Sequence, residues 1–320
     1  YLAQRMRALG LETDVLTFEV PEWRFGRARI TARDLVIDAH PGPYSPAIEG
    51  EGRLAVIRVP EDIDAAGDQG AILLLCDEIA RTQFTPRGYP FYSNPEHAAI
   101  LEALEAARPS AVMAATDRSP MTGAMSPFPL IEEVGFSVPT AYMTVEQGND
   151  LAKRAGEKVS VSIESEVRPS AGEQPVGRLV GAGGERIVVC AHVDSKPETP
   201  GALDNAAGVA VLLAVAELLG ADMPGCTVEF VPFNGEDHVL APGELAWLSA
   251  NDDLSGIRLA VNIDAAGLAG GPSAYSLYGV DATTTAAVER AASVFVQVSE
   301  GPQWPASDHM IFAMSGVPAI

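Results

Sequence analysis

The second half of the chain, from about residue 166 onward, alternates apolar runs with amphipathic segments, and this pattern constrains the fold most strongly. Runs typical of buried strands, such as "RIVVCAHVD" (186–194) and "TVEFVPFN" (227–234), alternate with stretches of helical periodicity, such as "NAAGVAVLLAVAELLG" (205–220). Strands and helices in this order form a sheet that is covered on both faces. We therefore predict an α/β fold with a mixed, largely parallel central sheet and helices on both faces.

The same alternation continues to the end of the chain. We expect helices over 242–250 and 282–297, and strands over 258–264, 274–279 and 317–320.

The first residues are expected to form a helix followed by a strand. Leu2, Met6 and Leu9 recur at helical spacing, Gly10 is a suitable helix stop, and "TDVLTFEV" (13–20) follows.

The segment 35–155 has a different texture. Short apolar runs such as "AILLLCD" (71–77) are separated by turn-rich stretches, and helices are expected over 95–109 and 144–156. This pattern predicts a smaller, β-rich domain at 35–155, inserted into a domain that residues 1–34 and 156–320 form together.

The composition is that of a soluble globular protein, with 47% hydrophobic and 20% charged residues. The net charge of -22 argues against a nucleic-acid backbone or an anionic membrane as partner. No apolar run is judged long enough to cross a bilayer. The three cysteines lie in or beside apolar runs and predict buried free thiols.

Polar residues stand where the predicted strands end, and ligands gather outside the carboxyl ends of strands in such sheets. The candidate site residues are His192 and Asp194 after the first run, Asp204 at the start of a helix, Glu236 and Asp237 after the next run, Asp264 at the end of "RLAVNID", and His309 in "SDHMIF".

Each position also has a purely structural explanation. His192 beside Asp194 is compatible with a core histidine paired with an acid, and Asp204 with a helix N-cap. Asp264 is compatible with a turn residue and His309 with an ordered loop.

Taken together, histidines and carboxylates on consecutive strand ends indicate a metal site. Nitrogen and oxygen ligands without thiolate suit zinc, with manganese or cobalt as alternatives. Two histidines and three carboxylates make five ligands, which is more than one catalytic zinc usually takes from a protein. If one of the carboxylates bridges, the five ligands fit two metals. Of the adjacent acids Glu236 and Asp237, one can bind metal while the other handles a proton.

The order H-x-D, D-N at a helix start, an adjacent acid pair, N-x-D and S-D-H resembles metallopeptidase family 28, the co-catalytic zinc aminopeptidases. The resemblance covers residues 1–20 and about 166–320. The segment between them is similar to the protease-associated (PA) domain that many members carry as an insertion, and "FSVPTAYMTVEQGNDL" (136–151) is similar to the end of that domain.

The resemblance implies a role for each candidate residue. His192 and Asp264 would hold one Zn²⁺, Asp237 and His309 a second, and Asp204 would bridge both. The Asp194 carboxylate would orient His192, and Glu236 would be the general base.

The activity implied is that of a zinc-dependent exopeptidase, an aminopeptidase hydrolysing N-terminal peptide bonds with a metal-bridging water. Its substrate would be a peptide with a free N-terminus. A glutaminyl-cyclase-like transferase, a carboxypeptidase or dipeptidase of the same family, and a non-enzymatic receptor-like protein are the alternatives. A related carboxypeptidase or deacylase family usually has D-x-K-G where this chain has "DNAAG" (204–208).

Two departures from the family pattern bear on these expectations. Many members follow the acid pair with a G-L-x-G-S-like segment, whereas this chain has "HVLAPGELAW" (238–247), which affects the substrate pocket rather than the metals. The chain begins at Tyr1 inside an expected helix and stops inside an expected strand, so we expect a fragment at both ends. A cytoplasmic or a secreted location and any oligomeric state remain open.

Overall fold

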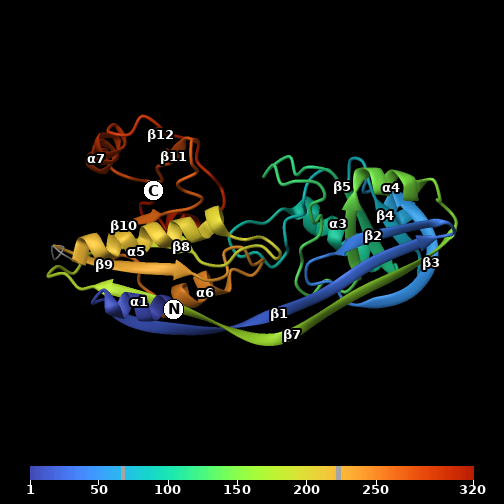
Figure 1. The fold of residues 1–320 in the computed structure, drawn as a ribbon, viewed down its shortest axis with the longest axis horizontal. Helices are drawn as coiled ribbons and strands as arrows, with labels where there is room; N and C mark the ends of the chain where they lie inside the picture. The colour runs from blue at the N-terminus through green and yellow to red at the C-terminus, as the bar shows by residue number, and fades with distance from the viewer. Residues whose placement is uncertain (66–68, 221–224) are drawn as a thin grey trace. The chain divides into compact units, whose positions relative to one another are not determined.

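The computed structural model describes residues 1–65, 69–220 and 225–320. The described chain forms two compact units, one of residues 1–20 with 171–320 and one of residues 21–170 (Figure 1). Two long strands, β1 (Glu12–Ala32) and β7 (Lys158–Leu179), contribute residues to both.

The unit that carries the candidate site is built on four strands in the order β7-β9-β8-β10. β8 pairs in parallel with β9 and β10, and β7 is antiparallel to β9. The sheet is therefore mixed and largely parallel, as predicted. The elements specific to this unit are α1 (Leu2–Ala8), β8 (Arg186–His192), the π-helical turn η1 (Ala202–Ala206), α5 (Ala207–Gly220), β9 (Thr227–Phe233), α6 (Pro242–Ala250), β10 (Ile257–Asn262), β11 (Ser273–Tyr275), α7 (Ala282–Ala292), β12 (Val298–Glu300) and α8 (His309–Ala313).

Helices cover both faces of this sheet, and side-chain alternation along the strands decides which face each residue joins. Val189 and Phe230 point into a core shared with Leu212 of α5, which runs along β8 and β9 (Figure 1). On the opposite face, the ring of Phe233 packs against Trp247 of α6 at 5.9 Å between centroids. His192 is the register partner of Phe233 and therefore lies on the α6 side.

Two expectations near the C-terminal end need correction. The helix expected over 282–297 ends at Ala292, and the residues after it lead into β12, which pairs with β11 in a separate small sheet. The strand expected over 317–320 is reduced to isolated bridges from Ala319 to Ala260 and to Tyr278, although Ile320 continues the hydrogen bonding alongside β10. The expected helix continues past Ala292 because "SVFVQ" (293–297) is largely apolar, but this segment is not buried in the structure.

One helical stretch, Ala202–Gly220, has the length and hydropathy of a membrane span, contrary to the expectation that no run would. Asp204 and Asn205 have non-helical dihedrals, so the regular helix is the 14-residue α5. A helix needs about 20 residues to cross a bilayer. Leu212 and Ala216 of α5 are buried in the core, as expected of a helix that packs on a sheet.

The second unit contains a sheet in the order β1-β2-β6-β5-β4-β3-β7. The strands β3, β4, β5 and β6 are parallel, and β2 is antiparallel to β6. Its other elements are β2 (Leu35–Pro41), β3 (Ile48–Ile57), α2 (Asp62–Ala65), β4 (Ile72–Leu75), α3 (Pro95–Ala106), β5 (Ala111–Thr116), β6 (Thr140–Thr144) and α4 (Val145–Ala152).

Alternate residues of β4 feed two cores in this unit. Ile72 and Leu74 pack with Leu151 of α4, and Leu73 and Leu75 pack with Leu101 of α3. The unit is thus a sheet with a helix on each face. The domain limits 34/35 and 155/156, and the assignment of this unit as a PA domain, remain predictions.

The cysteines are free, as predicted. Cys76 and Cys190 are buried, and Cys226 is half-buried.

Candidate metal centre and active site

His192 is the last residue of β8, the strand that lies between β9 and β10 in the sheet. Its side chain is 1% exposed. Because β8, β9 and β10 are parallel, the residues that follow each of them emerge at the same edge of the sheet. The imidazole therefore lies where the other candidate residues converge.

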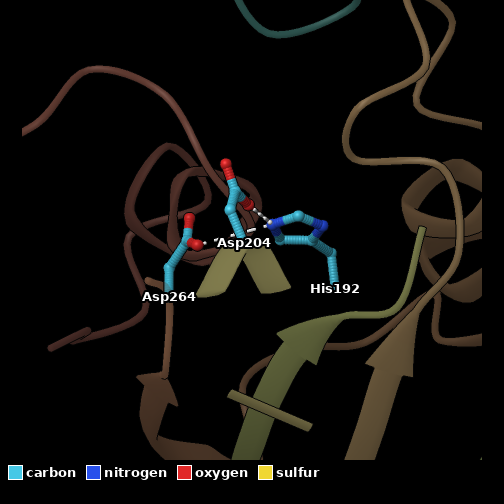
Figure 2. A group of neighbouring side chains, drawn as sticks. All are labelled: His192, Asp204 and Asp264. Carbon is cyan, nitrogen blue, oxygen red and sulfur yellow. Dashed lines mark ion pairs between the residues drawn. The ribbon is translucent and has the colours of Figure 1, made fainter. Parts of the chain in front are cut away.

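Three carboxylates surround the Nε2 atom of His192. Figure 2 shows Asp204 and Asp264 directed at it, with distances of 2.9 Å to Asp204 Oδ1 and 3.4 Å to Asp264 Oδ1. Glu236 Oε2 lies 3.9 Å from the same nitrogen. One imidazole nitrogen with several convergent carboxylate oxygens is the donor set that zinc accepts.

The turn before α5 carries Asp204 to this place. Gly201 has a left-handed backbone (φ 62°), which favours glycine. The neighbouring Asn205 is buried, accepts a hydrogen bond from the Gly208 N–H at 3.0 Å and donates to the Ile263 carbonyl at 2.9 Å. Asn205 thus caps α5 and ties it to the residue before Asp264, leaving the 63% exposed Asp204 side chain free of the capping role.

The carboxylate of Asp194 binds the acidic turn rather than lying closest to the imidazole. It accepts backbone N–H bonds from Gly235 at 2.8 Å, Glu236 at 3.2 Å and Asp237 at 3.1 Å. The Nδ1 atom of His192 is 3.0 Å from the Asp194 backbone carbonyl oxygen but 3.8 Å from its carboxylate. The predicted contact between the side chains of His192 and Asp194 is therefore longer than the contact of His192 with the Asp194 backbone carbonyl.

The acidic turn after β9 presents Glu236 and Asp237 on adjacent residues. Gly235 has a φ of 127°, and a Cβ atom there would lie 2.5 Å from the Pro242 ring, so only glycine fits. Lys196 Nζ donates to the Asp237 backbone carbonyl at 2.6 Å and lies 3.8 Å from its Oδ1.

Among the described residues, the groups able to share a metal are His192 with Asp204 and Asp264, and His192 with Glu236 and Asp237. His309 belongs to neither. Its ring is buried, its Nε2 contacts the Trp304 carbonyl at 3.0 Å, and its centroid lies 4.4 Å from that of Tyr278.

Burial changes the protonation of the acids in this region. It raises the pKa of Glu236 to about 8 and that of Asp237 to about 6. Burial alone would lower the pKa of His192, but the carboxylates of Asp264, Glu236 and Asp308 outweigh it and raise that pKa to about 11. Burial of charge that is paired with too little opposite charge is costly. The residues present therefore fit bound divalent cations.

The match to a known family covers all the candidate site residues. Residues 176–320 match the model of "Peptidase family M28". This part of the chain belongs to peptidase family M28. Its members are peptidases, hydrolases that act on peptide bonds.

Solved structures share the fold of this chain. An aminopeptidase from Aneurinibacillus sp. strain AM-1 has 20% identity and a TM-score of 0.72, covering 100% of this chain and 77% of its own. A zinc aminopeptidase from Bacillus subtilis has 20% identity and a TM-score of 0.69, covering 99% and 76%. A peptidase M28 precursor from Shewanella amazonensis SB2B has 18% identity, a TM-score of 0.67 and coverage of 99% and 76%. No curated protein matches the sequence.

Two buried acids near the site were not predicted: Glu244 was not singled out, and Asp308 of the S-D-H motif received no role. Glu244 of α6 is 2% exposed, and burial raises its pKa to about 7. Burial and the neighbouring charge of Glu244 raise the pKa of Asp308. Glu244 Oε2 and both carboxylate oxygens of Asp308 accept no hydrogen bond from the described residues. The sequence did hold one indication of Glu244: it lies three residues before Trp247 in an apolar helix, and this spacing places Glu244 and Trp247 on the same, inward face.

Proposed function

We propose that this M28 protein is a zinc-dependent aminopeptidase. The observation that carries the proposal is the convergence of three carboxylates, from three separate segments, on the Nε2 atom of one buried histidine at the carboxyl end of a parallel sheet. The fold shared with zinc aminopeptidases and the M28 match support it.

The proposed centre holds two Zn²⁺ ions. His192 and Asp264 would hold one, Asp237 and His309 the other, and Asp204 would bridge them. The proximity of His192, Asp204 and Asp264 supports the first assignment. The assignment of His309 rests on the S-D-H motif, since its Nε2 contacts the Trp304 carbonyl in this structure.

Bound zinc ions would acidify a water molecule and stabilise negative charge on the oxygen of the scissile carbonyl. Glu236 would accept the proton from the attacking water at its carboxylate and pass it to the leaving amine nitrogen. Positive charge nearby lowers the pKa of a carboxyl group and thereby keeps Glu236 in the form that accepts a proton. The Asp194 carboxylate holds the Glu236 backbone in place by accepting a hydrogen bond from the Glu236 N–H.

The charge of the whole chain favours the N-terminus of a peptide over its C-terminus. Two Zn²⁺ ions would offset the charges of their own carboxylate ligands but not the net charge of -22 that the chain carries. A substrate ammonium group is attracted to such a protein, whereas a terminal carboxylate is repelled.

A substrate panel tests the proposal. The metal-free protein would be incubated with one peptide in free, N-acetylated and C-amidated forms, with and without added zinc. An aminopeptidase releases the first residue from the free and C-amidated forms only, and only with zinc. Cleavage of the acetylated peptide but not the amidated one would show a carboxypeptidase instead. Cyclisation of a peptide beginning with glutamine, without release of an amino acid, would show the transferase.

A further inference from the structure

The two oxygens of the Asp264 carboxylate have different partners. Oδ1 lies 3.4 Å from His192 Nε2, and Figure 2 shows this oxygen on the side of the histidine while the other points away. Oδ2 accepts a hydrogen bond from the hydroxyl of Ser307 at 2.7 Å. Ser307 lies 43 residues further along the chain, so this contact is a product of the fold.

The direction of this hydrogen bond is fixed by a second one. Asn262 Nδ2 donates to Ser307 Oγ at 2.8 Å, so the Ser307 hydroxyl acts as acceptor there and directs its own proton to Asp264. Asn262 is the last residue of β10 and the register partner of Cys190 on β8, whose Sγ lies 3.7 Å from Asn262 Oδ1. The chain of hydrogen bonds is therefore anchored in the sheet itself.

The backbone of Ser307 is strained in a way that serves this contact. Its φ is 93°, in a region that residues with a Cβ rarely adopt. Such conformations are unfavourable and persist only where the surroundings enforce them. Here Ser307 is buried and its carbonyl accepts the Met310 N–H at 3.0 Å, which starts α8.

We propose that Ser307 is a positioning residue that binds Oδ2 of Asp264, so that Oδ1 alone is presented to a metal beside His192. This inference rests on the proposed zinc site. Partners that orient a metal ligand in this way typically contribute about 10–100-fold to metal affinity.

The test is equilibrium zinc binding to the metal-free protein, in competition with a chromogenic chelator. Ser307→Ala and Ser307→Gly both remove the hydroxyl, but glycine also relieves the backbone strain. We expect each to weaken one zinc equivalent by about 10–100-fold and to leave the other unchanged. Asn262→Ala, which leaves the Ser307 hydroxyl without its donor, should weaken the same equivalent by less.

Ser276→Ala is the matched control, because Ser276 Oγ donates to the Pro302 carbonyl at 2.7 Å and touches none of the candidate ligands. It should bind zinc as the wild type does. Thermal unfolding of each metal-free variant checks folding, and Ser307→Gly serves if the alanine variant does not fold.

Unchanged zinc affinity in Ser307→Gly would overturn the positioning role, as would equal weakening of both equivalents. If the wild type itself bound no zinc, the proposed function would fail, and this inference with it. If the wild type bound zinc and cleaved peptides while the variants matched it, only the inference would fail.

Discussion

The Oδ2 atom of Asp194 accepts the backbone N–H of Asp237 at 3.1 Å, across 43 residues of sequence. The other oxygen of Asp194 accepts the two preceding N–H groups. One side chain at the end of β8 therefore holds the whole acidic turn at the end of β9. It fixes where the proposed base and a proposed ligand stand relative to His192.

Removal of this anchor should loosen both roles at once. We expect Asp194→Ala to lower zinc affinity and kcat/KM by about 10–100-fold each, the usual effect of losing a partner that orients a metal ligand. Asp194→Asn keeps one acceptor oxygen and should lose less. Chelator competition and initial rates measure the two effects. Equal behaviour of the alanine variant and the wild type would contradict the anchoring role.

Glu236→Ala distinguishes a base from a ligand. The structure places Glu236 in a group with His192 and Asp237 that could hold a metal, so both roles are open to it. As the general base, its loss should reduce kcat by about two to four orders of magnitude while the zinc content stays the same. Elemental analysis alongside the rates decides. Loss of zinc from this variant would make Glu236 a ligand.

His309→Ala tests the second metal. We expect it to lose one zinc, because a histidine nitrogen is a ligand that alanine cannot replace. His40→Ala is the control, since His40 stacks on Tyr142 in the other unit, with 5.1 Å between ring centroids. Elemental analysis after dialysis gives the stoichiometry. Two zinc ions retained by His309→Ala would mean that the group around Glu236 and Asp237 holds the second metal.

The stability of the metal-free protein should fall as pH rises from about 4 to about 8. Folding raises the carboxyl pKa of Asp237 to about 6, of Glu244 to about 7 and of Glu236 to about 8. The folded state then holds protons that the unfolded chain has lost, so stability is complete below the unfolded pKa values and is lost through the folded ones. His192, whose pKa is raised to about 11, lowers the stability further above pH 6.5, because the folded state keeps a proton that the unfolded chain loses there.

Each excess proton held by the folded state changes the free energy of unfolding by about 1.4 kcal/mol per pH unit. Melting temperatures at about pH 5 and about pH 8 measure the effect. Added zinc should displace these protons and stabilise the protein more at the higher pH. A metal-free protein that became more stable toward about pH 8 would show that these acids are not protonated in the fold.

The sequence predicted the cluster around His192 because the ends of parallel strands meet at one edge of a sheet. His192 and Asp264 follow from that rule alone. Asp204 required the shape of the turn before α5, which its glycine and prolines suggested. What could not be predicted depends on contacts between distant segments: the hydrogen bonds of Asp194 to the acidic turn, and that of Ser307 to Asp264.

The strand β1 shows the same limit in the fold. The sequence suggested a strand over 13–20, but β1 extends to Ala32. Its later residues pair with β2, from Ala28 with Ala39 to Ala32 with Leu35. Ala28, Ile30 and Ala32 are buried and alternate with Arg29 and Thr31, but the residues between Val20 and Ala28 show no clear alternation of buried and exposed side chains. The continuity of β1 through this stretch is therefore not marked by an apolar pattern.

The most direct test of the zinc centre is a titration of the metal-free protein with zinc, followed by release of the first residue from an unblocked peptide. The proposed two-zinc centre predicts activity that is absent without zinc, rises to a plateau at two equivalents and does not appear in His192→Ala. Full activity without zinc, or in His192→Ala at the same zinc concentration, would contradict the assignment of the catalytic centre to the end of β8.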